Sequence, residues 1–320
     1  RTHTMNSIVI AERLHHRPLL RAAVLQWRLV AAALTTLVFW SGSYIAISIA
    51  MLELSPAPFA LARLGTAAIV LALVSPLFGR TVFALPRLKD LPFIALMAAL
   101  GFPLYHTAIN AGQTIVSAGV TSLLIATLPI FAAVIASIGL KEKLAARGWL
   151  GIAIAFAGSA LLIAGSGKEF SFDSYTLLVL LAAFLGAGFM VVQRFLIRAY
   201  SGIALTVWGI WIGSAMLLPF SSQLITELRT VSDATILSIL YLGIFPTALS
   251  YVTWSYVLKM LPAARASSLL YFVPPITFVF AWLILGDLPS LIDIASGIII
   301  IAGVALVQRA PRTPAKRYST

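Results

Sequence analysis

Polar and aromatic side chains interrupt long apolar stretches of this sequence, and their types limit the chemistry that the chain can perform. The candidates for contacting a ligand are Trp40, Ser43, Tyr44, Tyr105, His106, Asn110, Gln193, Tyr251, Trp254 and Tyr271. Aromatic walls combined with hydroxyl and amide groups suit an amphipathic zwitterion or a flat organic molecule. The same walls could hold a quaternary ammonium ion through cation–π contacts, and the sequence does not separate these ligands.

Among the Lys, Arg, His, Asp and Glu residues, only His106 and Arg63 lie more than one helical turn inside the apolar stretches. His106 is the one imidazole there, and an ionisable group in such a place is a functional candidate. It could hydrogen-bond a ligand, exchange protons, or bond a neighbouring helix as a neutral group. We expect a structural role for Arg63, which could extend outward to solvent or pair with Glu53; attraction of a carboxylate is the alternative.

The residues needed for catalysis are missing from the sequence. Cysteine is absent, and there is no His-Glu-x-x-His pattern, no carboxylate pair inside an apolar stretch and no Gly-x-Ser-x-Gly elbow. Metal and dyad chemistry therefore cannot be assembled, and a Ser–His pair that uses His106 is the one alternative left open. We predict that the chain is not an enzyme and has no catalytic residue, metal site or cofactor.

The elements that must position these side chains are membrane-spanning helices. Of the 320 residues, 61% are hydrophobic and only 10% are charged, against about 25% charged in an ordinary soluble domain. A bilayer core about 30 Å thick requires roughly 20 apolar residues of helix. The sequence predicts ten such spans, at Val30–Ala50, Pro58–Phe78, Leu91–Gly112, Ser117–Gly139, Gly148–Ser166, Ser174–Ile197, Ile203–Ser221, Ile236–Leu258, Ala266–Leu285 and Ile292–Val307.

The basic residues predict the orientation of these spans. With the N-terminus placed in the cytoplasm, 19 of the 22 Lys and Arg residues fall in cytoplasmic segments, and only Lys168 and Arg229 fall on the opposite side. This asymmetry is the positive-inside rule, and it predicts an even number of spans with both termini cytoplasmic. The net charge of +12 therefore reflects the topology of the spans and not binding to nucleic acid.

The sequence repeats itself at an offset of 145 residues. Ser122 aligns with Ser267, Pro129 with Pro274, Glu142 with Asp287, and Gly158 with Gly303. Each repeat holds five predicted spans, so the second copy must insert upside down. We predict an all-α polytopic membrane protein in which ten transmembrane helices form two inverted five-helix repeats around a central cavity. The segments are 1–29 (basic N-terminal segment), 30–169 (first repeat), 170–309 (second repeat) and 310–320 (basic tail).

Prolines interrupt corresponding spans of the two repeats. Pro103 and Pro246 lie in the third and eighth spans, and Pro129 and Pro274 lie in the fourth and ninth. A proline inside a helix removes a hydrogen bond, which is tolerated in a membrane where the freed carbonyl finds a partner or lines a cavity. Paired interruptions indicate a transport site. We therefore expect the four prolines to mark helix breaks that take part in gating, although a simple packing kink is the alternative for any one of them.

Three motifs resemble those of the EamA type of the drug/metabolite transporter superfamily. They are Trp40-Ser41-Gly42-Ser43-Tyr44, similar to its Trp-Gly-Ser-aromatic opening; Pro58 with Arg63, similar to its Pro…Arg pair; and Pro129 with Lys141-Glu142 and Pro274 with Gly286-Asp287, similar to its Pro…Gly-Glu pattern. Ser41 and Asp287 depart from the usual Gly and Glu, and the second half carries Gly186-Ala187-Gly188-Phe189 in place of Trp-Gly. Within the superfamily, the chain most resembles bacterial amino-acid exporters of the YddG kind.

The resemblance implies a secondary transporter or facilitator that works by alternating access. We expect it to export small amphipathic metabolites, foremost hydrophobic or aromatic amino acids. Export of cationic drugs or quaternary ammonium compounds is the first alternative, and a lipid flippase or non-transporting membrane protein is the second. The expected partners are a small-molecule substrate and the lipid bilayer; the pattern Gly209-xxx-Gly213 could also mark the face of a homodimer.

Overall fold

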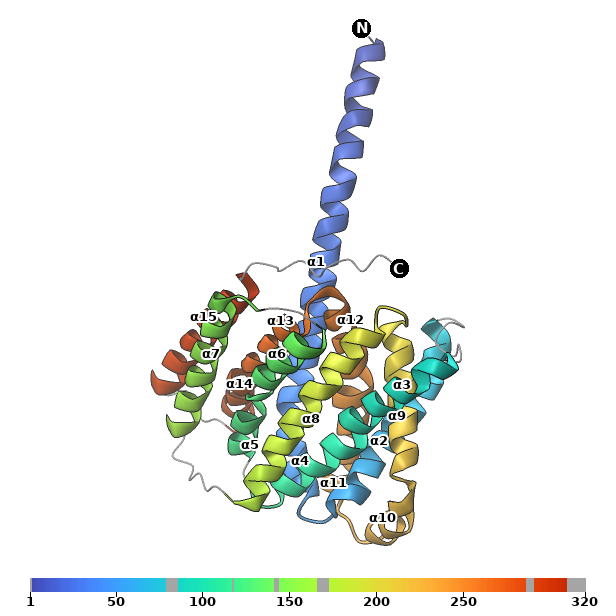
Figure 1. Cartoon of the computed structure of the whole chain (residues 1–320), viewed down its shortest axis with the longest axis vertical. Coiled ribbons are helices and arrows are strands. Elements are labelled where there is room, and N and C mark those ends of the chain that lie inside the picture. The colour runs from blue at the N-terminus through green and yellow to red at the C-terminus, as the bar shows by residue number, and fades with distance from the viewer. Residues whose placement is uncertain are drawn as a thin grey trace.

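The protein is helical throughout the part of the chain that the structure describes. The computed structural model describes residues 2–78, 86–116, 118–140, 144–165, 173–285 and 291–309. The first half contains α1 (Thr2–Ala50), α2 (Pro56–Val74), α3 (Leu91–Ala99), α4 (Tyr105–Gln113), α5 (Ala118–Ile125), α6 (Leu128–Gly139) and α7 (Ala146–Gly165). The second half contains α8 (Ser174–Leu196), α9 (Gly202–Met216), α10 (Ser221–Glu227), α11 (Asp233–Leu242), α12 (Ser250–Met260), α13 (Ala263–Ser268), α14 (Val273–Leu285) and α15 (Leu291–Arg309). Figure 1 shows them as one bundle.

Five helical stretches in the described residues are long and apolar enough to cross a membrane. They are Leu25–Ala50, Pro56–Val74, Leu88–Gln113, Ser174–Leu196 and Asp233–Met260. A sixth is possible where Gly202–Met216 and Leu218–Glu227 meet at a bend of 48°. The protein is therefore an all-helical, multi-pass membrane protein, and the ten predicted spans are found in part. Other predicted spans coincide with shorter helices such as α6 or α7.

Several spans begin at side chains that cap their first turn. Asp173 accepts a hydrogen bond from the Thr176 backbone at 2.9 Å at the start of α8. Ser201 and Ser232 do the same for α9 and α11, respectively. Such caps satisfy backbone N–H groups that have no partner within the helix. They explain why α9 and α11 begin slightly before the apolar stretches from which their positions were predicted.

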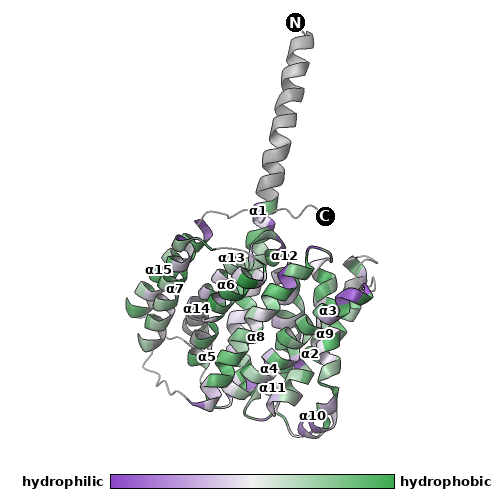
Figure 2. Cartoon of the chain, viewed as in Figure 1, coloured by the Kyte–Doolittle hydropathy of each residue, from purple (hydrophilic) through white to green (hydrophobic). Residues whose placement is uncertain are grey.

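The outer faces of the bundle carry large apolar side chains. Ile69, Leu73, Ile138 and Leu237 are each at least 65% exposed, and Figure 2 shows hydrophobic residues over the outside of most helices. A soluble protein would not leave so many large apolar groups uncovered. The exposed faces are therefore the surfaces that contact lipid.

Small residues bring two pairs of helices close together. α7 lies along α15 at one edge of the bundle (Figure 1), and a Cβ atom added to Gly151 would come within 2.7 Å of the Gly303 carbonyl oxygen. On α9, both Gly209 and Gly213 pack against Phe102 of the same chain. The Gly209-xxx-Gly213 pattern thus serves packing within this chain, and the homodimer that it could have marked stays a prediction.

Candidate functional site

A cavity of about 60 Å³ lies inside the bundle, between elements of both halves of the chain. Seven predicted site residues line it, six of them predicted ligand contacts and the seventh Arg63. The six are Trp40, Ser43, Tyr44, Tyr105, His106 and Tyr251. They come from α1, α4 and α12, so the cavity depends on side chains that are far apart in the sequence.

Aromatic rings form one wall of the cavity. The Trp40 ring lies 5.5 Å from the Tyr251 ring and 5.2 Å from the Trp254 ring. Phe189 contacts Tyr251 edge-on at 5.6 Å. Edge-to-face pairs at these distances are favourable and hold the rings in fixed orientations. The wall is therefore rigid, and it presents both ring faces and a phenol to the cavity.

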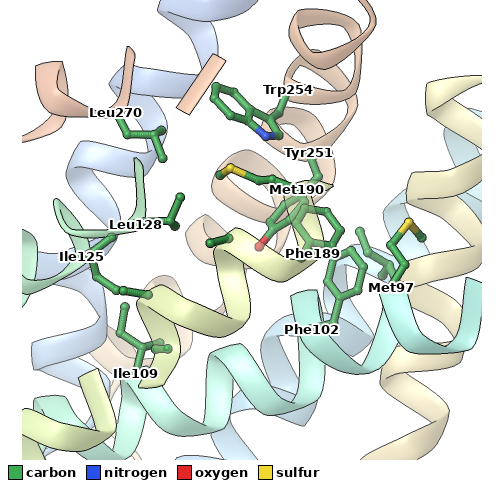
Figure 3. Close-up of a cluster of buried hydrophobic side chains, with 14 of the residues drawn as sticks. Met97, Phe102, Ile109, Ile125, Leu128, Phe189, Met190, Tyr251, Trp254 and Leu270 are labelled. Atoms are coloured by element: carbon green, nitrogen blue, oxygen red, sulfur yellow. The ribbon is translucent and has the colours of Figure 1, made fainter. Parts of the chain in front are cut away.

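The opposite wall is aliphatic. Ile125 and Leu128 belong to the α5–α6 region, and Figure 3 shows them across from Phe189, Met190 and Tyr251. Sequence reasoning did not select Ile125, Leu128 or Met190, since an apolar residue does not stand out in an apolar helix. Phe189 could have been selected from the sequence. It is the last residue of Gly186-Ala187-Gly188-Phe189, which stands in the second half where the first half has its Trp-Ser-Gly-Ser-Tyr motif.

Two of the four prolines lie in π-helical turns beside the cavity. Pro103 lies in the turn Leu100–Leu104 between α3 and α4, and Pro246 lies in the turn Gly243–Leu249 between α11 and α12. π-Helical turns are uncommon and are frequent at functional sites. The sequence predicted helix breaks at both prolines; the structure has a π-helical turn at each, inside the continuous helical stretches Leu88–Gln113 and Asp233–Met260.

Aromatic donors cross between the halves to bind these turns. The Trp40 indole Nε1 donates to the Pro246 carbonyl oxygen at 2.8 Å, and the Tyr251 hydroxyl donates to the Gly101 carbonyl oxygen at 3.3 Å. Each donor belongs to the half of the chain that does not contain the turn it binds. We call these two bonds the crossed hydrogen bonds. Each bond therefore joins a side chain of one half of the chain to the backbone of a π-helical turn in the other half.

The other two prolines also coincide with helix interruptions. Pro129 is in the first turn of α6, directly after the break that ends α5. Pro274 is in the first turn of α14, which follows a 3-10 turn at Leu269–Phe272. The Lys141-Glu142 and Gly286-Asp287 parts of the predicted motifs lie outside the described residues.

Four predicted contact residues are buried but do not line the cavity. The Asn110 side-chain amide donates to the Pro56 carbonyl at 3.0 Å, and that of Gln193 donates to the Ser255 hydroxyl at 2.9 Å. Trp254 lies behind Trp40, fully buried. Tyr271 packs in a separate apolar cluster with residues of α7 and α15. Their side chains face neighbouring helices, so a contact with a ligand in this cavity would need a rearrangement.

Arg63 lies on the cavity and not at the solvent. It is 3% exposed, and its Nε donates to the Thr247 hydroxyl at 2.7 Å. The expected pair with Glu53 is not formed, because the Glu53 carboxylate accepts hydrogen bonds from the Ser232 backbone and hydroxyl at 2.8 and 3.1 Å. The expectation that Arg63 extends outward was wrong, since α2 places its side chain against the turn that contains Pro246.

His106 is a buried polar group of the cavity that lacks hydrogen-bond partners among the described residues. Its ring is 1% exposed and lies edge-on to Tyr105 at 5.1 Å. Neither ring nitrogen has a hydrogen-bond partner among the described residues. Leaving a buried donor or acceptor unpaired costs about 1–3 kcal/mol, so such groups usually have a functional reason. A neutral imidazole offers one donor and one acceptor to a ligand.

A cluster of carboxylates and serines ties helix starts together at the end of the bundle where α10 lies (Figure 1). Besides the Glu53–Ser232 bonds, the Glu227 carboxylate accepts from the Ser55 backbone at 3.0 Å and hydroxyl at 2.6 Å. We call these four residues the acidic clasp. Hydrogen bonding from Thr235 and from Ser232 lowers the pKa of the Glu53 carboxyl below its ordinary value. The clasp therefore holds its charged form at neutral pH.

The sequence is similar to proteins that are named as transporters. The Bacillus subtilis protein named "Uncharacterized transporter YdfC" is 35% identical over 266 residues, which are 83% of this chain and 86% of that protein. A Streptantibioticus cattleyicolor protein named "Probable terminal-alkyne amino-acid exporter" is 33% identical and covers 88% of this chain and 93% of its own length. A protein named "Probable amino-acid metabolite efflux pump" from Salmonella typhimurium is 27% identical over 198 residues, 58% of this chain and 66% of that protein.

The fold also has a solved counterpart. One crystal structure superposes with a TM-score of 0.69 at 16% identity, covering 87% of this chain and 95% of that one. The model of the EamA-like transporter family matches this sequence twice, over residues 27–164 and 173–309. Together the two matches span nearly the whole chain, as two copies of one domain. The chain therefore belongs to the EamA-like transporter family of the drug/metabolite transporter superfamily, and it is a transporter and not an enzyme.

Proposed function

We propose that the protein is a secondary transporter that exports small amphipathic metabolites, foremost hydrophobic or aromatic amino acids. The observation that carries the proposal is the cavity itself, which has polar and aromatic groups on α1, α2, α4 and α12 and apolar side chains on α5, α6 and α8. An amphipathic molecule can satisfy both kinds of wall at once. Relatives named as amino-acid exporters support the same substrate class.

We further propose that transport uses two inverted repeats of five spans each, bounded at 30–169 and 170–309. The two matched π-helical turns support this arrangement, since a proline lies at corresponding positions in the third and eighth spans. Inverted repeats place a substrate site at their interface and move against each other to alternate access. The basic residues support a cytoplasmic location of both termini, with segments 1–29 and 310–320 on that side of a bacterial inner membrane.

Transport requires this cavity to widen. Its volume of about 60 Å³ is well below the roughly 300–1,000 Å³ of ordinary small-molecule sites. We propose that the helix breaks at Pro103, Pro129, Pro246 and Pro274 are where the bundle moves to open one side or the other. Changes confined to a few breaks, with the helices between them kept rigid, are a common form of conformational switching.

Counterflow in proteoliposomes tests the proposal. Vesicles containing the purified protein are loaded with unlabelled phenylalanine and given labelled phenylalanine outside; a parallel set uses choline. We expect phenylalanine to accumulate, and Trp40→Ala to reduce the initial rate about 10-fold by removing a cavity wall. The matched control is Trp149→Ala, because Trp149 is partly exposed on α7 and does not line the cavity.

Each other outcome overturns a stated part of the proposal. Accumulation of choline alone would replace amino acids by quaternary ammonium compounds, which the aromatic wall could hold by cation–π contacts. Scrambling of labelled lipid without solute counterflow would identify a flippase. Equal rates for Trp40→Ala and Trp149→Ala would exclude this cavity as the transport site.

A further inference from the structure

The cavity contains one buried positive charge and, among the described residues, no negative charge to balance it. Arg63 is always protonated under physiological conditions. Its only hydrogen bond to the described residues runs from Nε to the Thr247 hydroxyl, which is neutral. A buried charge with no partner is strongly unfavourable, whereas a buried charge that pairs with a bound ligand is stabilised when the ligand arrives.

Four of the described carboxylates make hydrogen bonds at the ends of helices. Glu53 and Glu227 belong to the acidic clasp. Asp90 accepts a hydrogen bond from the Tyr200 hydroxyl at 2.6 Å, and Asp173 caps α8. Asp233 is exposed in the first turn of α11, and no described carboxylate lines the cavity. The protein therefore supplies no described carboxylate that could serve as the partner of Arg63.

The free side of the guanidinium suits a carboxylate. With Nε bound to Thr247, the four N–H groups on its two terminal nitrogens have no hydrogen-bond partner among the described residues. Two parallel N–H donors match the two oxygens of a carboxylate and bind it in bidentate fashion. The aliphatic wall of Ile125 and Leu128, with Met190 across the cavity, can accept the apolar part of the same molecule.

We propose that Arg63 binds the carboxylate of the substrate, and that the site accepts amphipathic carboxylates in general, with the α-ammonium group of an amino acid tolerated and not required. This inference rests on the proposed function, because it assumes that the cavity is the transport site. The ammonium group would meet only neutral acceptors and ring faces, among them Tyr44, Tyr105 and the imidazole of His106. A simple cation would face Arg63 with no described carboxylate to attract it.

Competition on the unmodified protein is the direct test. Counterflow of labelled phenylalanine is measured against 3-phenylpropionate, which lacks the ammonium group, and against phenylalaninamide, which lacks the carboxylate. We expect 3-phenylpropionate to compete at concentrations within about threefold of phenylalanine, and phenylalaninamide to require a concentration about 10-fold to 100-fold higher. This comparison needs no substitution, so it does not depend on whether a variant folds.

Two variants add a second test. Arg63→Lys keeps the charge but loses the paired donors, and we expect it to weaken competition by 3-phenylpropionate at least about 10-fold. Arg229→Lys, at an exposed position outside the cavity, is the matched control and should behave like the unmodified protein. If Arg63→Lys does not yield folded protein, the competition series on the unmodified protein decides the question.

The outcomes separate the two proposals. If phenylalaninamide competes as well as phenylalanine, carboxylate binding by Arg63 is wrong while amino-acid transport stands. If labelled 3-phenylpropionate accumulates and phenylalanine does not, the amino-acid proposal fails and the carboxylate site stands. If only choline accumulates, both are wrong.

Discussion

The two π-helical turns share a proline and a place beside the cavity, but they are held in different ways. The turn Leu100–Leu104 is held mainly by apolar packing: Phe102 is fully buried and contacts the rings of Phe189 and Tyr251 at 5.5 and 5.0 Å. The turn Gly243–Leu249 also packs closely, with Gly243 against Thr66 of α2, but it receives polar contacts from Trp40, Arg63 and Ser250 in addition. Packing resists any displacement, whereas hydrogen bonds can be exchanged for others. A ligand in the cavity could therefore act on the second turn through Trp40 and Arg63, which line the cavity and bond to that turn.

The largest effect is expected where a side chain is added to the closely packed turn Leu100–Leu104. A Cβ atom at Gly101 would collide with the Phe189 ring, so Gly101→Val should prevent normal folding, at a cost of about 3 kcal/mol or more. The measurement is the yield and melting temperature of the purified protein in detergent. Gly65→Val is the control, since nothing lies within 4 Å of a Cβ atom at that position. A normal melting temperature for Gly101→Val would show that this turn is not held by packing.

A smaller loss of stability is expected at the turn Gly243–Leu249. Thr247→Val removes the acceptor of Arg63 and leaves a buried charge with no hydrogen bond to the described residues, which should lower stability by about 2 kcal/mol. Thr247→Val should also reduce phenylalanine counterflow, because Arg63 lines the cavity. This reduction should be larger than the one caused by a packing substitution that lowers stability by the same amount. Thr66→Val serves as the comparison, since the Thr66 hydroxyl bonds only within its own helix. Equal counterflow rates in the two variants would remove the distinction between the turns.

Removing one of the crossed hydrogen bonds should have a modest effect on stability. Trp40→Phe keeps an aromatic ring but leaves the Pro246 carbonyl without its donor, at a cost of about 1 kcal/mol. We expect the counterflow rate to change. The concentration of 3-phenylpropionate that halves counterflow should stay within about threefold of its value for the unmodified protein. If the rate stays constant and only binding weakens, Trp40 acts as a wall of the cavity and not as a support of the turn.

The smallest effect is expected from the acidic clasp. The clasp holds the start of α11, and the other end of α11 leads into the turn Gly243–Leu249. The pKa of Glu53 is lowered in the folded state from its ordinary value of 4.5. Its contribution to stability is therefore present above pH 4.5 and is lost as the pH falls below that value toward the folded-state pKa. Melting temperatures of the unmodified protein and of Glu53→Gln should differ slightly at pH 7 and converge below about pH 4.5. A difference that is independent of pH would contradict this role.

The sequence predicted much of this architecture for a simple physical reason. A polar or aromatic residue inside an apolar helix is conspicuous, and so is a proline, so Trp40, His106, Pro103 and Pro246 could be found without a structure. Six residues chosen in this way line the cavity. Their roles in binding and gating stay predictions until transport is measured.

What the sequence could not predict depends on which way each side chain faces. Asn110 and Gln193 are as conspicuous as Tyr105, yet both bond to neighbouring helices away from the cavity. The helical repeat fixes which residues share a face, but the crossing of neighbouring helices decides what that face meets. Arg63 was misplaced for the same reason: its depth from the end of α2 suggested a route to solvent, while the structure turns it inward.

The crossed hydrogen bonds make each half of the chain incomplete without the other. A single half, produced alone, would keep its proline-containing turn but lose the aromatic side chain that binds it, because Trp40 and Tyr251 each serve the other half. Two copies of the second half would not restore the bond that Trp40 makes, because that half carries Gly186-Ala187-Gly188-Phe189 in place of the tryptophan motif. The two repeats have therefore become different parts that cannot replace each other.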